Sequence, residues 1–189
     1  MCKREKTMFA LFFLGVLFFC QSHATLSQGS GGDDPDAKEV MLKLPLTYMI
    51  RSLGEYDLRC GYQRFYNETQ GSDKRTYEKY DLYFWYRNGR MTSQPRYVRR
   101  VTGSTIHMGN RPEEYFPETS QLQILFSDVS SCMITRNPDK AFPKACNLMV
   151  TKGSSSAPPR ICLTKFQQHC NSTGFTYAID NNCPEPPTK

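Results

Sequence analysis

Cysteine is the residue type whose number and spacing in this sequence point to definite chemistry. Of the eight cysteines, Cys2 and Cys20 belong to the N-terminal segment that we expect to be removed on export. Five of the remaining six fall within residues 132–183, and the sixth stands far upstream at position 60. Such a set could bind zinc or form disulfides. The spacing contains no Cys-x-x-Cys pair and histidine is scarce, so zinc is disfavoured and three disulfides are predicted, with the pairing open. The six residues are Cys60, Cys132, Cys146, Cys162, Cys170 and Cys183.

The N-terminus predicts that the chain is exported. A basic start is followed by the apolar run Phe9–Cys20 and then by Ser22 and Ala24, the small residues that a signal-peptide cleavage site needs. The run is shorter than the roughly 20 residues of a helical membrane span. We therefore expect residues 1–24 to be a signal peptide, the product to be secreted and extracellular, and the membrane not to be a partner.

Charge and the lack of catalytic motifs narrow the function further. Removal of residues 1–24 takes away three of the 24 basic and one of the 18 acidic residues, so the net charge falls from +6 to +4. Because the basic residues form no long runs, no nucleic-acid partner is expected. The exported part has two histidines, His107 and His169, and no metalloprotease, serine-hydrolase or phosphate-loop motif. We expect no enzymatic activity, no cofactor and no metal.

The exported part divides into a leader and one domain. Residues 25–36 are polar and glycine-rich and predict a flexible leader, whereas residues 37–189 predict a folded domain that begins with a short helix over residues 37–44. Eight segments rich in β-formers then follow, with little helix between them. They are residues 46–52, 58–66, 75–87, 97–101, 104–108, 122–128, 132–136 and 146–152.

Turns and a late helix complete the pattern. Residues 67–74 predict a turn, and Asn88-Gly89 predicts a two-residue hairpin turn. A proline pair starts a helix over residues 159–169, and residues 175–179 return to strand. A sandwich or an up-and-down barrel would produce such a series, and a single late helix on a closed meander favours the barrel. We predict an all-β fold, an eight-stranded antiparallel barrel with a C-terminal helix and a final short strand.

Aromatic and basic residues on these strands could serve a ligand. Tyr80 and Phe84 share one face of the longest predicted strand, and with Phe126 they are candidates for lining a cavity. The alternative is ordinary barrel core, since small barrels fill with side chains. One inward arginine near the barrel mouth could hold a carboxylate by a bidentate fork, although a solvated edge strand is the simpler explanation. These arginines are Arg96, Arg99 and Arg100.

The cysteine-rich part resembles the tick salivary lipocalins, the family of the histamine-binding proteins. The resemblance rests on Cys132-Met133-Ile134, on Asn147-Leu148-Met149 after twelve residues, and on Cys162 after another twelve. It covers about residues 36–183 and implies a lipocalin barrel. The family pairing implies disulfides Cys60–Cys183 and Cys132–Cys162, which leaves Cys146–Cys170 as the third.

The sequence departs from the family where amine-binding relatives carry acids. In those relatives an acid after the first cysteine and the Glu of a Glu-Leu-Trp motif pair with the ligand's ammonium. The corresponding positions here are Met133, Asn147 and Met149, which point inward if Cys132 and Cys146 point outward. A buried cation needs a negative partner, so the resemblance implies that one amine subsite is lost. Polarizable Met side chains suit an apolar ligand instead.

The resemblance implies capture of a small-molecule ligand without turnover. The expected ligand is a biogenic amine such as histamine, or a lipid mediator, and capture in tick saliva would suppress host defence at the bite. The alternative is a protein-interaction lipocalin that blocks complement or platelet activation, with a host protein as partner. Asn67 and Asn171 begin glycosylation sequons, each in a predicted loop, so the product is expected to be a glycoprotein.

Overall fold

The structure is a computed structural model that describes residues 31–70, 76–139, 141, 144–179 and 183–184. The expected signal peptide, residues 1–24, and the first part of the expected leader lie outside the described residues. In the described part of the chain, no helix has the length and apolar character that a membrane span requires.

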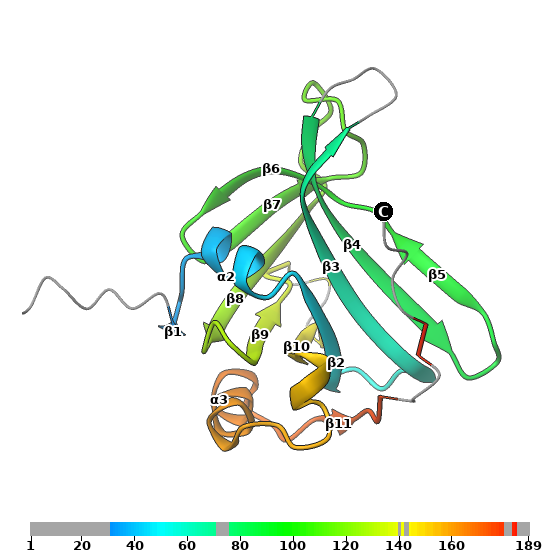
Figure 1. Ribbon diagram of the computed structural model, residues 1–189, viewed down its shortest axis with the longest axis vertical. Helices are drawn as coiled ribbons and strands as arrows, with labels where there is room; N and C mark the ends of the chain where they lie inside the picture. The colour runs from blue at the N-terminus through cyan, green and yellow to red at the C-terminus, as the bar shows by residue number, and fades with distance from the viewer. Residues whose placement is uncertain (1–30, 71–75, 140, 142–143, 180–182, 185–189) are drawn as a thin grey trace, which may run out of the picture.

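Eight antiparallel strands close into a barrel (Figure 1). Each strand pairs with its neighbours along the chain, β10 pairs with β2, and the β8–β9 pairing completes the ring. The predicted all-β, lipocalin-like barrel is therefore confirmed. The strands are β2 (Leu46–Ser52), β3 (Leu58–Gln70), β4 (Thr76–Tyr86), β6 (Tyr97–Thr102), β7 (Thr105–Gly109), β8 (Ser120–Ser127), β9 (Cys132–Arg136) and β10 (Cys146–Val150).

Three further strands attach to the barrel. β1 (Gly32–Asp33) pairs with β8, β5 (Met91–Gln94) with β4, and β11 (Phe175–Thr176) with β2. β1 falls inside the segment expected to be a flexible leader, so the ordered chain begins earlier than predicted. β5 was not predicted because its short polar sequence has no apolar alternation; pairing with the longer β4 supports it instead.

The β3–β4 and β4–β5 hairpins differ from prediction in their turns. β3 continues to Gln70 where a turn was expected from residue 67, because pairing with β4 extends the ladder beyond the apolar part. Asn88-Gly89 does lie in a turn, but its loop has three residues: Tyr86 N–H donates to the Arg90 carbonyl at 2.9 Å. Gly89 adopts φ 82°, the left-handed conformation that closes such a loop.

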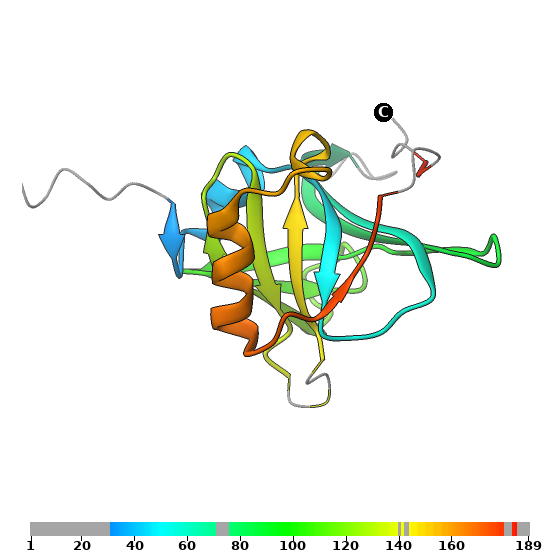
Figure 2. The same ribbon diagram turned by 90° about the horizontal axis from the view of Figure 1, so that it is seen from below.

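Two α-helices pack on the barrel: the first closes one end of it, and the second covers one side of its outer face. α2 (Ala37–Lys43) begins at Asp36, whose side chain accepts from the Lys38 N–H at 2.9 Å, and buries Val40 and Met41 in the barrel interior. α3 (Arg160–Cys170) packs outside β8, β9 and β10 (Figure 2). A short 3₁₀-helix, η1 (Lys152–Ser154), precedes it. Both α-helices occur where the sequence predicts them.

The barrel wall separates two apolar cores, and disulfides join its outer side to the C-terminal part. The inner core fills the barrel, whereas the outer core lies between the sheet and α3. Cys132–Cys162 and Cys146–Cys170 connect β9 and β10 to α3, and Cys60–Cys183 connects β3 to the last described residues. This pairing is the one that the family resemblance implies. Each bond contributes on the order of 3–5 kcal/mol by restricting the unfolded chain.

Strand β1 is held to α3 by an ionic contact. The Asp33 carboxylate accepts from Lys165 Nζ at 2.5 Å and from His169 Nε2 at 2.7 Å, across more than 130 residues of chain. These two hydrogen bonds, the one from Lys165 first, hold the pKa of Asp33 below its ordinary value of 3.8. His169 therefore has a structural contact that connects the N-terminal strand to the C-terminal helix.

We expect Asp33→Asn to lower the free energy of unfolding at pH 7 by about 0.5–1 kcal/mol, the range for an exposed ion pair. Because the pKa of Asp33 is lowered on folding, this contribution is present above pH 3.8 and is lost as the pH falls through the lowered pKa. Urea unfolding at pH 7 and at pH 2 measures the difference. Asp34→Asn is the matched control, and an Asp33→Asn deficit that persists undiminished at pH 2 would contradict the ionic explanation.

Two tyrosines on opposite faces of β4 provide a second stability test. The Tyr80 hydroxyl is buried with no hydrogen-bond partner among the described residues, whereas the Tyr83 hydroxyl donates to Asp81 Oδ2 at 3.0 Å. Tyr80→Phe removes an unsatisfied buried group and should raise the free energy of unfolding by about 1 kcal/mol. Tyr83→Phe loses a bond to a carboxylate and should lower it by about 1–2 kcal/mol. Equal effects of the two substitutions in urea unfolding would contradict this assignment.

Candidate functional site

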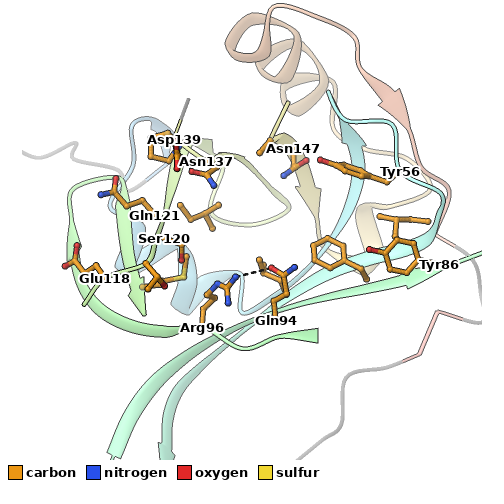
Figure 3. Close-up of a pocket in the computed structure, with 18 residues that line it drawn as sticks. Tyr56, Tyr86, Gln94, Arg96, Glu118, Ser120, Gln121, Asn137, Asp139 and Asn147 are labelled. Atoms are coloured by element: carbon orange, nitrogen blue, oxygen red, sulfur yellow. Dashed lines mark hydrogen bonds between the residues drawn. The ribbon is translucent and has the colours of Figure 1, made fainter. Parts of the chain in front are cut away.

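A cavity of about 800 Å³ lies at the barrel mouth, opposite the end closed by α2 (Figure 3). The ends of β4, β7 and β9 and the starts of β3, β8 and β10 meet there, as the alternating strand directions of a meander require. The loops between β2 and β3, β7 and β8, and β9 and β10 form the rim. The cavity is therefore built from segments scattered over the chain between residues 56 and 147.

The cavity combines an apolar and aromatic part of its wall with a similar share of polar residues. Leu82, Phe84 and Tyr86 come from alternate positions of β4, as its parity predicts. Leu58 on the neighbouring strand β3 pairs with Tyr86 and continues this apolar surface. Met108 on β7 and Leu122 on β8 also line the cavity. Tyr56 stands at the rim with 41% of its side chain exposed. Such a wall favours a ligand with an apolar body.

A guanidinium group projects into this cavity. Arg96 Nη2 donates to Gln94 Oε1 at 3.2 Å (Figure 3), and Nη1 donates to the Pro95 carbonyl at 3.1 Å. No carboxylate in the described ranges forms an ion pair with Arg96. Burial lowers the pKa of Arg96 below its ordinary value, although the group stays protonated at physiological pH. The site thus holds a partly desolvated positive charge whose protein partners are neutral.

The neighbouring arginines have structural contacts. Arg99 donates to the backbone carbonyls of Arg111 at 2.5 Å, Pro112 at 2.9 Å and Glu113 at 2.7 Å, and so holds the β7–β8 loop. Arg100 binds Glu118 instead. A register shift between Val98 and Arg100 interrupts the simple alternation along β6. Arg96 is therefore the arginine of the three that reaches the cavity.

Two acids line the cavity, and one of them, Glu118, is already paired. Glu118 accepts from Arg100 Nε at 2.7 Å and lies 3.1 Å from His107 Nδ1. The Arg100 hydrogen bond lowers the pKa of Glu118, with His107 contributing in the same direction. Its negative charge is thus largely compensated within the protein. Asp139 lines the outer rim and accepts the Ala141 N–H at 2.9 Å.

Two neutral polar atoms of the cavity residues have no partner. Asn147 Oδ1 and Ser120 Oγ are buried without a hydrogen bond to any described residue. An unsatisfied buried polar atom costs about 1–3 kcal/mol, which a hydrogen-bonding ligand could recover. Asn147 offers an acceptor, and the Ser120 hydroxyl offers either a donor or an acceptor. The cavity can therefore bind an apolar molecule with one anionic group and further polar groups.

The predicted cavity residues occupy three places in the structure: the cavity itself, the inner core and, for Phe126, the outer core. Phe84 and Asn147 line the cavity, whereas Tyr80, Met133 and Met149 face the same interior but pack in the inner core. Cys132 and Cys146 point outward, so the predicted parity of β9 and β10 agrees with the structure.

Phe126 was placed wrongly. It lies in the outer core with Lys165 Nζ 5.5 Å from its ring centroid. The reason is a register shift between Ile124 and Phe126: Leu122 and Ile124 face inward, but the shift turns Phe126 outward.

Sequence reasoning missed the loop residues of the rim, such as Tyr56 and Asn137, because loops carry no periodicity that indicates direction. The glycosylation candidates Asn67 and Asn171 are both exposed. Asn67 lies in β3 rather than in a loop, and Asn171 follows α3 with φ 54°. Use of either sequon stays a prediction.

Leucine substitutions of two phenylalanines test which side of the wall each occupies. Phe84→Leu should weaken binding of the fluorescent dye anilinonaphthalene sulfonate, which has an aromatic body and one anionic group, by about fivefold or more. Phe126→Leu should leave dye affinity unchanged and lower the free energy of unfolding by about 1 kcal/mol. Dye titration and urea unfolding measure the two effects. A loss of dye affinity in the Phe126 variant equal to that in the Phe84 variant would contradict the orientation.

The family model described as tick histamine binding protein matches residues 63–185. No curated protein matches the sequence. The fold is similar to the crystal structure of the AM182 serotonin complex, with TM-score 0.54, 20% identity, and coverage of 84% of this chain and 96% of that chain. It is also similar to Per a 4, a major allergen from cockroaches, with TM-score 0.50, 10% identity, and coverage of 74% and 82%.

Proposed function

The chain belongs to the tick histamine-binding protein family, and we propose that it captures a small host mediator in the cavity at the mouth of its barrel. A volume of about 800 Å³ falls within the range of about 300–1,000 Å³ that small-molecule sites occupy. Capture is stoichiometric: the bound molecule is withdrawn from solution and is not transformed. Secretion into tick saliva and suppression of host defence at the bite belong to this proposal, and the three disulfides support an oxidising, extracellular setting.

The observation that carries the ligand class is Arg96. Its guanidinium lines a cavity that also has apolar and aromatic walls, and within the described residues its hydrogen-bond partners are neutral. A carboxylate on the ligand would receive a bidentate, charge-assisted hydrogen bond there. The aromatic and aliphatic wall would bury the rest of the molecule. We therefore favour an apolar mediator with one acidic group, a lipid mediator, as the ligand.

A biogenic amine is the alternative within the same proposal. Family membership supports it, as does the fold shared with AM182, a protein crystallised with serotonin. The local charges disfavour it. Asn147 is neutral, Glu118 is already paired with Arg100, and Arg96 would repel an ammonium group in a medium of low dielectric constant. An amine would instead depend on neutral acceptors such as Asn147 Oδ1.

A second candidate function is the binding of a host protein. Tyr115 on the β7–β8 loop is 78% exposed, and the loop is held by three hydrogen bonds from Arg99 to backbone carbonyls. A rigid loop with an exposed aromatic residue is typical of protein-binding surfaces. Co-elution with a protein from host serum in gel filtration, abolished by Tyr115→Ala, would support this function.

Isothermal titration calorimetry against arachidonate, a leukotriene, histamine and serotonin tests the ligand class. We expect the acids to bind more tightly than the amines. Arg96→Met should weaken acid binding about 10- to 100-fold, because it removes hydrogen bonds from a charged donor. Asn147→Glu should increase amine affinity by placing an acid where amine-binding relatives carry one.

Arg136→Met is the matched control, since Arg136 is exposed and donates to Gln123 Oε1 at 2.9 Å outside the cavity. Histamine binding that is tighter than acid binding and insensitive to Arg96→Met would contradict the proposed ligand class. If none of the four compounds binds, capture of a small mediator of these classes is excluded.

A further inference from the structure

We infer that the hydroxyl of Tyr177 positions Tyr56 at the rim of the cavity, so that the segment after α3 controls ligand exchange. The inference depends on the proposed function in one respect: it takes the cavity as the site where the ligand binds. Tyr177 lies 121 residues from Tyr56 in the sequence. It does not line the cavity and acts through the β2–β3 loop, residues 53–57, which connects two strands of the barrel.

The segment after α3 returns along β2 in a defined register. Phe175 pairs with Ser52 and Thr176 with Arg51, and the Tyr177 N–H donates to the Ile50 carbonyl at 2.9 Å (Figure 2). Disulfides hold both sides of the segment, Cys146–Cys170 before it and Cys60–Cys183 after it. Tyr177 is thereby presented to the β2–β3 loop from a fixed position.

A close approach at Gly174 makes this path possible. Gly174 has φ 63°, and a Cβ atom at this position would lie 2.6 Å from the Ser52 carbonyl oxygen. A larger residue would therefore be strained by its backbone conformation and would collide with the backbone of β2. The segment can run this close to β2 because residue 174 is glycine.

One hydroxyl group makes two hydrogen bonds to the same loop. Tyr177 Oη donates to the Gly54 carbonyl at 2.6 Å and accepts the Tyr56 N–H at 2.8 Å. Burial raises the pKa of Tyr177, so the hydroxyl keeps the proton that it donates. The two rings also lie near each other, with centroids 6.4 Å apart. Tyr177 thereby holds these two backbone groups of the loop in one geometry.

The loop conformation determines where the Tyr56 ring lies. A Cβ atom on Gly54 would lie 2.4 Å from the Tyr56 ring, so the ring folds directly over this glycine. In that position it stands at the rim near Tyr86 and Asn147 (Figure 3). The other aromatic residues of the cavity, Phe84 and Tyr86, lie on a barrel strand. Tyr56 is thus the aromatic wall residue whose place depends on a loop, and the loop depends on Tyr177.

The test uses Tyr177→Phe, which keeps the ring and removes the hydroxyl. Hydrogen–deuterium exchange of the Tyr56 amide should accelerate about tenfold, since its acceptor is lost, while amides in β9 and β10 keep their protection. Dissociation of anilinonaphthalene sulfonate in stopped-flow fluorescence should accelerate about tenfold. Its association rate should change less than threefold, because the cavity itself is intact. Tyr77→Phe, on β4 outside the cavity lining, is the matched control and should change neither rate.

A double-mutant cycle with Tyr56→Ala separates an effect that acts through Tyr56 from a general loss of stability in Tyr177→Phe. If Tyr177 acts through Tyr56, adding Tyr177→Phe to Tyr56→Ala should accelerate dye dissociation no further. Additive effects would overturn the inference, as would an unchanged Tyr56 amide or an unchanged dissociation rate in Tyr177→Phe. The proposed function fails separately: in that case host mediators do not bind, while the dye kinetics still respond to Tyr177→Phe.

Discussion

The fold depends on one constraint, that the closed sheet is a single layer whose two faces must both be covered. Along β9 and β10 the side chains alternate between the inner core, which holds Met133 and Met149, and the outer core, which holds Cys132 and Cys146. Closing the ring removes free strand edges but leaves apolar residues on the outer face. α3 covers these residues, and two disulfides attach it there. The cysteine-rich end of the chain is thus the cover of the barrel wall.

The interior of the barrel differs between its two ends. α2 fills one end with Val40 and Met41, and Met133, Met149 and Tyr80 belong to the same inner core. At the other end the strands separate into loops, and polar side chains replace apolar ones. The cavity therefore has an apolar wall and a polar rim. This arrangement gives a captured molecule both the area to be buried and the polar groups that orient it.

Charge decides what this cavity favours within a family known for binding amines. Met133 and Asn147 carry no charge. Of the two acids that line the cavity, Asp139 lies at the outer rim and Glu118 accepts hydrogen bonds from Arg100 and His107. Arg96 is left with neutral partners. A shared fold at 20% identity does not decide the ligand, because a few side chains set the electrostatics of the cavity.

The sequence by itself determined the features that follow from local pattern: the eight barrel strands, the two helices, the inward parity of Met133, Asn147 and Met149, and the six cysteines available for bonding. Alternation has a period of two wherever a strand is regular, so these features can be predicted from neighbouring residues. Only the tertiary structure decided the direction of Phe126, the pairing of β5, the neutral surroundings of Arg96 and the contact between Tyr177 and Tyr56. Register shifts and hydrogen bonds between distant segments depend on the partner strand or loop, which no local pattern specifies.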